Sequence, residues 1–313
     1  HNPATGGPWI AKKEIYGINS GEINGNNNKQ VAMTFVREQA PGVEKQFLTN
    51  AEQGTITMNG NNSMGFSFNV DDLYAEAKNE GKIILNGKNN YGFAFGKGVA
   101  NNHLKVDSVI SNDIKGTIEI NGDNSGGFAL EEMIDSSNTP YIKNINITNK
   151  GKIDINSKES FGMYSEQMKA TNNGEININE NAVSSIGLYS TKKNTVNTEL
   201  VNKGKINIKS KKNKNIGLFT DSAKVTNDTD GIVNVLNGEN IGAFILGTGV
   251  GENVGKISSV ADGSITVLTK DSGNFINKGE IRVNAKTSST NNGAIGILAN
   301  TGSSFTNSNG KLY

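Results

Sequence analysis

The sequence predicts an all-β fold, a right-handed parallel β-helix of about nine coils with loop insertions at one corner. One observation is a phrase of Gly, polar, Ile, polar, Ile and Asn that returns along most of the 313 residues. Another is a second Gly, followed by an apolar residue, that comes 11 residues after the first Gly in five copies. The third is that unit length varies, from about 23 to 35 residues, almost entirely after this second phrase.

The first phrase provides the strands. It begins at Gly54, Gly81, Gly116, Gly151, Gly174 and Gly204, with weaker copies at Gly21, Gly231 and Gly279. Its apolar residues alternate with polar ones, which is the period of a half-buried β-strand. One such strand cannot bury its apolar face alone, but stacking each unit on the previous one buries that face and pairs the backbone. We therefore expect isoleucine pairs such as Ile118 and Ile120 to form one continuous dry column, with right-handed connections.

Asparagine is unusually frequent, with 49 residues, and six of them follow the first strand of a unit. In a stacked fold these residues would form a column at one corner, where each amide could bond to the amides above and below. An alternative is that they are simply good turn formers, because Asn tolerates the left-handed backbone of a sharp turn. The six residues are Asn59, Asn86, Asn121, Asn156, Asn179 and Asn284.

The two ends differ from the repeat. Residues 1–20 do not match it and are expected to form an N-terminal cap or a partial coil, with Trp9 plugging the core of the first coil rather than serving as a ligand platform. Residues 21–313 are expected to form the β-helix repeats. Gly310 to Tyr313 resembles the start of another unit, so we expect the chain to be cut in mid-coil at its C-terminus and to continue in the native protein.

Composition excludes several classes of function. A net charge of +1 gives no long-range attraction to nucleic acid. The absence of cysteine removes disulfides, thiol catalysis and Cys-based metal sites, and two histidines, His1 and His103, nearly exclude a histidine metal centre. No apolar run is long enough for a membrane-spanning helix. We predict no cofactor, no bound metal and no catalytic residues.

Motifs that could carry chemistry are weak. Residues 122–127, with Ser125, are similar to the nucleophile loop of chymotrypsin-like proteases, but the same slot in other units marks a repeat corner. Asp71 and Asp72 precede a Leu-Tyr-Ala-Glu-Ala-Lys segment, which we interpret as a short helix with an aspartate cap rather than a catalytic acid pair. Short lysine runs at 192–193 and 209–214 are expected to be solvated corners, with binding of anionic glycans as the alternative.

Two features could bind a partner. Inserts after Phe35, Phe68, Phe95 and Leu130 leave the repeat at the same corner, so they should cluster on one side of the rod as a binding face or as a shield for its end. The second feature is the position two residues after the second Gly, which is small or polar in early units and aromatic later. We predict that these aromatic side chains point outward as a partner-binding ladder, although cover by another segment or a slip into the core would also fit. The predicted ladder comprises Tyr164, Tyr189, Phe219 and Phe244.

Phrases such as ITNKGKIDINSKESFGMYS and LVNKGKINIKSKKNKNIGLFT resemble the passenger domains of type V autotransporters, most of all the Asn- and Lys-rich adhesins of fusobacteria. The resemblance covers roughly residues 21–313. It implies a right-handed β-helix displayed outside a Gram-negative cell. It also implies an N-terminal signal peptide and a C-terminal membrane β-barrel, neither of which is in this sequence. Such proteins bind host-cell receptors or other bacteria, and some autotransporters carry protease or lipase domains instead.

Taken together, the sequence predicts an extracellular adhesin segment of a bacterial surface autotransporter, a stalk that presents binding surfaces. We expect it to be a monomer without enzymatic activity. Expected partners are a host-cell surface protein or glycan receptor, and also other bacteria. No nucleic-acid partner is expected. Attachment to a membrane is expected only through the β-barrel that this sequence lacks, and that barrel would place the full-length protein at the outer membrane. The alternative is a carbohydrate-active lyase or hydrolase, which would need converging acidic groups in a groove.

Overall fold

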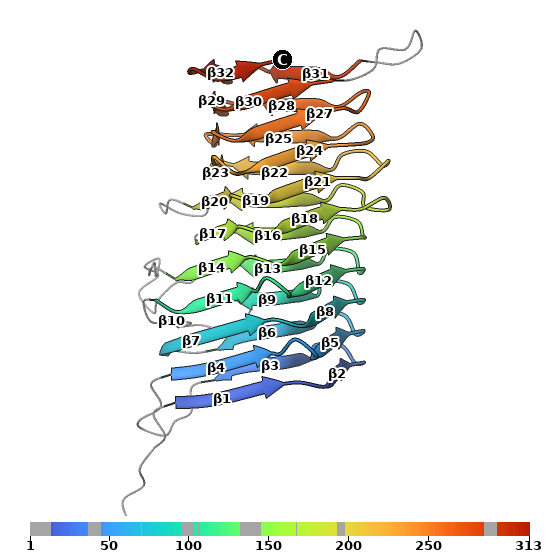
Figure 1. The fold of residues 1–313 in the computed structure, drawn as a ribbon, viewed down its shortest axis with the longest axis vertical. Helices are drawn as coiled ribbons and strands as arrows, with labels where there is room; N and C mark the ends of the chain where they lie inside the picture. Colours follow the sequence, from blue (N-terminus) through green and yellow to red (C-terminus); the bar gives the residue numbers. More distant parts are fainter. Residues whose placement is uncertain are drawn as a thin grey trace, which may run out of the picture.

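A computed structural model describes residues 14–36, 45–69, 71–95, 103–104, 107–131, 145–166, 168–192, 198–284 and 293–313. Within these ranges the chain consists of β-strands and tight turns without a helix, and the strands wind into a rod with a right-handed parallel β-helix fold (Figure 1). Each strand pairs in parallel with the equivalent strand of the next coil, about 4.8 Å away. The predicted fold is confirmed.

Three sheets form the walls of the rod. The first sheet has 12 strands, in which β10 (His103–Leu104) pairs only with β7. Its other strands are β1 (Glu14–Asn19), β4 (Lys45–Asn50), β7 (Asp71–Asn79), β11 (Val109–Asn112), β14 (Asn146–Asn149), β17 (Lys169–Asn172), β20 (Glu199–Asn202), β23 (Lys224–Asn227), β26 (Val250–Asn253), β29 (Asn274–Asn277) and β32 (Ser304–Asn307).

The second sheet has 11 strands and contains the repeated Ile-x-Ile phrase. Its strands are β2 (Glu22–Gly25), β5 (Thr55–Met58), β8 (Lys82–Leu85), β12 (Thr117–Ile120), β15 (Lys152–Ile155), β18 (Glu175–Ile178), β21 (Lys205–Ile208), β24 (Ile232–Val235), β27 (Lys256–Ser259), β30 (Glu280–Val283) and β33 (Lys311–Leu312).

The third sheet has 10 strands, which begin near the second glycine of each unit. They are β3 (Val31–Val36), β6 (Met64–Asn69), β9 (Tyr91–Phe95), β13 (Gly126–Leu130), β16 (Phe161–Ser165), β19 (Ile186–Thr191), β22 (Ile216–Asp221), β25 (Ile241–Leu246), β28 (Ile265–Thr269) and β31 (Ile295–Ala299).

The rod contains more coils than the nine estimated from the repeat. Ten coils contribute a strand to each sheet, and β32 and β33 belong to a further coil. The unit that begins at Gly255 was missed because its phrase is Gly-Lys-Ile-Ser-Ser, in which Ser259 stands at the second inward position. Ser259 is fully buried there and pairs its hydroxyl with that of Ser264, so a polar pair replaces an apolar side chain.

The core is the dry column that the repeat predicts. Inward side chains of the second sheet stack in register from coil to coil, as in Ile118, Ile153 and Ile176, and all three are fully buried. Phenylalanine rings continue this packing on the third sheet near the N-terminal end, where Phe66, Phe93 and Phe128 stack with centroids 4.8 and 4.6 Å apart. Such stacked pairs stabilise a fold by about 0.5–1.5 kcal/mol beyond their buried area.

A column of asparagines, buried in all but the first and last of the described coils, ends every strand of the first sheet except β10. The side-chain amide of each donates to the side-chain carbonyl of the next coil's asparagine at 2.7–2.8 Å. The same amides from Asn50 onward also donate to backbone carbonyls of the adjoining corner, such as Gly54 O. This column, called the buried ladder, comprises Asn19, Asn50, Asn79, Asn112, Asn149, Asn172, Asn202, Asn227, Asn253, Asn277 and Asn307.

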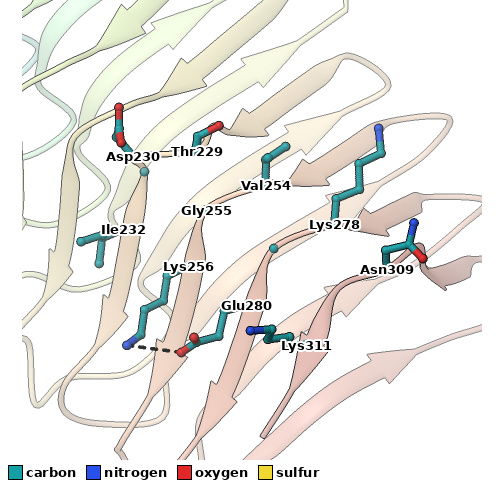
Figure 2. Close-up of a pocket in the computed structure, with 12 residues that line it drawn as sticks. Thr229, Asp230, Ile232, Val254, Gly255, Lys256, Lys278, Glu280, Asn309 and Lys311 are labelled. Carbon is teal, nitrogen blue, oxygen red and sulfur yellow. Dashed lines mark ion pairs between the residues drawn. The ribbon is translucent and has the colours of Figure 1, made fainter.

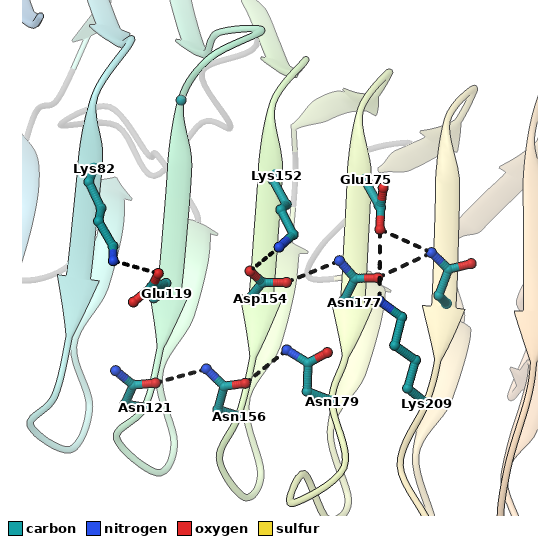
Figure 3. Close-up of polar contacts among 12 residues, drawn as sticks. Lys82, Glu119, Asn121, Lys152, Asp154, Asn156, Glu175, Asn177, Asn179 and Lys209 are labelled. Carbon is teal, nitrogen blue, oxygen red and sulfur yellow. Dashed lines mark hydrogen bonds and ion pairs between the residues drawn. The ribbon is translucent and has the colours of Figure 1, made fainter. Parts of the chain in front are cut away.

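The asparagine column predicted from the sequence lies at a different corner, between the second and third sheets, and is more exposed. Asn59, Asn86, Asn121, Asn156 and Asn179 bond in series at 2.8–2.9 Å, and Asn59 extends the column to Asn26 (part of it in Figure 3). The stacked arrangement is therefore confirmed for these five. Asn284 does not join them, because Lys209, Leu236 and Val260 occupy the equivalent positions of the intervening coils.

One secondary-structure prediction was wrong. Residues 71–79 form strand β7 and not a short helix, and they pair in parallel with β4 and β11. Side chains alternate along the strand, with Ala75 and Ala77 buried between half-buried Tyr74, Glu76 and Lys78. Stacking between two neighbouring coils thus overrides the helix preference of Ala, Glu and Lys.

We expect Asn202→Ala to lower the free energy of unfolding by about 2–4 kcal/mol. The substitution removes the side-chain acceptor of the Asn172 amide and the side-chain donor to the buried carbonyl of Asn227. The matched control is Asn121→Ala, which breaks two bonds in the exposed column and should cost less than about 1 kcal/mol because water replaces the amide. Urea unfolding of both variants measures the difference, and equal losses would contradict the role given to burial.

Candidate binding surfaces

The predicted aromatic ladder exists on the outer side of the third sheet. Tyr164, Tyr189, Phe219 and Phe244 lie in register on β16, β19, β22 and β25. Their ring centroids are 4.8, 4.9 and 5.3 Å apart in sequence order. The preceding residue of each strand, such as Met163, is buried, so strand alternation directs the rings away from the core. All four rings are half-buried, largely because they cover one another.

A second outward column runs beside the rings at the start of the same strands. It consists of Phe161 followed by isoleucines, and two leucines continue the aromatic column toward the C-terminal end. Most of these side chains are half-buried, whereas Ile295 and Leu298 are exposed at 43% and 39%. The two columns form one apolar surface, here called the aromatic face: Phe161, Tyr164, Ile186, Tyr189, Ile216, Phe219, Ile241, Phe244, Ile265, Leu268, Ile295 and Leu298.

The aromatic face begins at β16 because the preceding coils carry small outward residues. Ala94 and Ala129 occupy the ring positions in β9 and β13 and are buried beside Tyr91 and Phe161. The Phe161 ring lies over Gly126, where a Cβ atom would come within 2.0 Å of the ring. A side chain at position 126 would therefore displace this ring, which closes the N-terminal edge of the face.

Acidic side chains border the rings at the ends of their strands. The Tyr164 hydroxyl donates to Glu166, and burial followed by this hydrogen bond raises the pKa of Tyr164 far above its ordinary value. Burial, then the nearby carboxylates of Asp221 and Glu166, raises the pKa of Tyr189. Both tyrosines therefore remain neutral hydroxyl donors at physiological pH.

Corners between the first and second sheets vary in length and form two hollows. Most of these corners place one residue between the ladder asparagine and the glycine that follows it, but three corners have three such residues and the corner at 307–310 has two. A hollow of about 520 Å³ lies where the short corners 253–255 and 277–279 stand between the longer corners 227–231 and 307–310 (Figure 2). We call this hollow the corner groove.

A smaller hollow of about 240 Å³ lies over the short corner at 79–81, between the long corners 50–54 and 112–116. Glu52, Glu80, Asp113, Ile114 and Lys115 line it. The Lys115 ammonium spans the hollow and bonds both carboxylate oxygens of Glu52 at 2.8 Å. Three carboxylates thus line one hollow, which is the feature that bears on the alternative enzymatic function.

The outer side of the second sheet is polar. Asn177 donates to Asp154, Asn207 to Asn177, Asn234 to Asn207, and Ser258 to Asn234, at 2.9–3.1 Å. Ion pairs flank this row, such as Lys82–Glu119 and Lys152–Asp154, each at 2.7 Å (Figure 3). Because these groups bond to one another along the rod, we interpret this side as a solvated wall.

The structure also locates the other residues that the sequence singled out as candidates for catalysis or binding. The Ser125 hydroxyl is buried and donates to backbone carbonyls, so Ser125 is a repeat corner and not an exposed nucleophile. Lys211, Lys212 and Lys214 are exposed on a corner, as expected. Trp9 and Lys193 lie outside the described residues, as do residues 37–44, 96–102 and 132–144 of the predicted inserts after Phe35, Phe95 and Leu130. The described remainder of the insert after Phe35 contains strand β4, and the insert after Phe68 is part of strand β7.

Across the described ranges, no set of three or more His, Asp or Glu side chains is arranged to hold a metal ion. No helix there is long and apolar enough to cross a membrane. Sequence reasoning missed both corner hollows. The sequence signal that could have predicted them is the number of residues between each ladder asparagine and the next glycine. A depression forms where a short corner lies between longer ones.

A known protein family resembles this chain in sequence. The family described as the BigA third pectate lyase-like domain matches residues 5–196. A solved structure, the TibC-catalysed hyper-glycosylated fragment of TibA, is 9% identical, with 94% of this chain and 97% of the fragment covered, and has a TM-score of 0.22. Among curated proteins there is no match.

We expect the stability of the fold to fall as pH rises through about 10, and Tyr164→Phe to reduce that fall. The unfolded tyrosine ionises near pH 10, whereas burial and Glu166 hold the folded hydroxyl neutral, so the stabilisation is present below pH 10 and is lost above it. Urea unfolding midpoints at pH 8 and pH 11 measure the change. Lysines that titrate in this range are common to both proteins, so an identical fall in both would contradict the assignment.

Proposed function

The chain belongs to the family of the BigA third pectate lyase-like domain, and from that premise we propose that it is an adhesive segment that binds host-cell surface proteins. Together with the strand-only repeat fold, the match bears out the resemblance to a passenger domain of an autotransporter adhesin, which lies at the cell surface or outside the cell. Anchoring through an outer-membrane β-barrel and binding to other bacteria belong to the proposal.

The observation that carries this proposal is the aromatic face. Six rows of paired apolar side chains lie on a flat sheet, along about 24 Å of the rod. Contiguous apolar patches on this scale mark interaction sites, and tyrosine and phenylalanine at their centres contribute much of the binding energy. A rod stiffened by continuous sheets holds such a face at a fixed distance and orientation.

Ring orientation favours a protein partner over a glycan for this face. Neighbouring rings are tilted by 57–59° to one another, so they form a herringbone row instead of a flat platform. A sugar stacks on one exposed ring face, and a long glycan would need successive coplanar rings. Apolar side chains of a protein can instead pack against the ridged surface that tilted rings form, as they do in a packed core.

A second candidate function is cleavage of an acidic polysaccharide. The hollow lined by Glu52, Glu80 and Asp113 favours it, since lyases and hydrolases use grouped carboxylates. The family description also contains the words pectate lyase-like. Against it, the Glu52 carboxylate is already paired with Lys115, and these two side chains are 60% and 66% exposed, so they stand in open solvent and not in an enclosed site.

The adhesive function predicts that Tyr189→Ser combined with Phe219→Ser weakens binding to host cells at least tenfold. Loss of two central aromatic anchors removes at least about 2 kcal/mol, and tenfold corresponds to about 1.4 kcal/mol. The control is Tyr16→Ser, because Tyr16 is 64% exposed on the outer side of the first sheet. Binding of the labelled chain to intact and protease-treated cells measures the effect. Undiminished binding by a correctly folded double variant would remove the aromatic face as the site.

The enzymatic candidate predicts release of reducing or unsaturated ends from polygalacturonate, which Glu52→Gln would reduce at least tenfold. The matched control is Glu22→Gln, since Glu22 is an exposed outward residue of β2 outside the hollow. End-group assays on the purified chain decide between the functions. The absence of product at high protein concentration would leave the adhesive function alone.

A further inference from the structure

The corner groove is an open surface depression, which arises because neighbouring corners differ in length. Its ends are the longer corners that contain Thr229 and Asp230 on one side and Asn309 on the other, as Figure 2 shows. Between them lie three coil steps of about 4.8 Å, or about 14 Å. The volume of about 520 Å³ falls within the range of sites for small ligands. The groove therefore fits a ligand of two or three sugar units rather than a polymer that runs past it.

The floor of the groove is bare backbone. Gly255 and Gly279 lie at its centre, and a Cβ atom at either position would come within 2.2 Å of the carbonyl oxygen of the preceding coil's glycine. Amide groups of this floor are already used between coils: Gly279 N donates to Asn253 O, and Glu280 N donates to Gly255 O. The floor thus offers little to the main chain of a peptide, and recognition must come from the side chains.

Those side chains combine polar groups of both signs with an apolar strip. Ile232 and Val254 are half-buried and present methyl groups. Three lysines and two carboxylates belong to the lining. The lining residues that can hydrogen-bond a ligand are Thr229, Asp230, Lys256, Lys278, Glu280, Asn309 and Lys311. Hydroxyl-rich ligands with apolar ring faces match this mixture.

Of the three lysines, two are held in ion pairs and the third is available to an anion. Lys256 pairs with Glu280 at 3.4 Å and Lys278 with Glu252 at 2.6 Å. Among the described residues no carboxylate pairs with Lys311, which stands directly beside Glu280 in the register of β30 and β33. An anionic group near Lys311 would complete an alternating row of charges along the groove wall. Such a contact is exposed, so salt should weaken it.

We propose that the corner groove binds a short acidic oligosaccharide, with its carboxylate or sulfate at Lys311 and a sugar ring over Val254. This inference rests on the proposed adhesive function, to which it adds a second site on a different side of the rod. The aromatic face binds protein, and the corner groove binds an acidic glycan of the same target surface.

The test titrates the whole chain with 3′-sialyllactose, a sulfated chondroitin disaccharide and neutral lactose, by calorimetry and ligand-observed NMR. At least one acidic probe should bind at least tenfold more tightly than lactose, and the preference should shrink as salt rises from 20 to 300 mM (about 21 to 6 Å in screening length). The probe that binds identifies a carboxylate or a sulfate as the anion. Equal affinity for all three, or no binding by either acidic probe, overturns the proposal.

Two variants locate the site. Lys311→Ala should weaken the affinity for the acidic probe about tenfold and leave the affinity for lactose unchanged. Val254→Trp should abolish binding by filling the groove, whereas Asn173→Trp places the same ring at the equivalent position of a short corner outside it. If Val254→Trp binds as well as Asn173→Trp, the groove is not the site. If Lys311→Ala changes nothing, the anion does not lie there and the assignment falls.

The outcome is independent of the test of the aromatic face. The Tyr189 and Phe219 double variant should still bind the acidic probe, and Val254→Trp should still bind host-cell protein. If the unmodified chain binds the acidic probe but does not bind host cells, the proposed function is refuted and this site is not. The opposite pattern would refute only the corner groove.

Discussion

The structure depends on satisfying one buried amide in every coil. An asparagine side chain enclosed in the rod has donors and an acceptor that water cannot reach, and leaving them unpaired costs more than the hydrogen bonds contribute. Only an asparagine at the same place in the next coil satisfies them in both directions. The buried ladder therefore fixes the register of the first sheet, and the parallel pairing of the other two sheets follows from it.

This constraint also explains where the chain is free to vary. Residues between a ladder asparagine and the next glycine lie outside the wall, so one, two or three of them fit without disturbing the register. Outward positions of the third sheet are equally free, which lets alanine at Ala129 give way to tyrosine at Tyr164 in the next coil. The corner groove and the aromatic face both arise from changes that the ladder tolerates.

Much of the fold could be predicted from the sequence because strand burial has a period of two and stacked units repeat it. The same rule predicted the outward rings of Tyr164, Tyr189, Phe219 and Phe244. It failed at residues 71–79, where Ala, Glu and Lys favour a helix locally and only neighbouring coils make a strand. It also missed the coil at Gly255, where serine replaces isoleucine. The corner groove could not be predicted from any single unit, because the depression forms only where corners of adjacent coils differ in length.

The buried ladder holds an inner coil more firmly than any coil at which such a ladder ends. Detaching an inner coil would break amide bonds on two sides, whereas a terminal coil is held on one. Local opening is therefore cheapest at the extremities, and unravelling proceeds inward coil by coil. Under a mechanical pull on the end of such a ladder, coils would separate in small successive steps while the rest of the column stays intact.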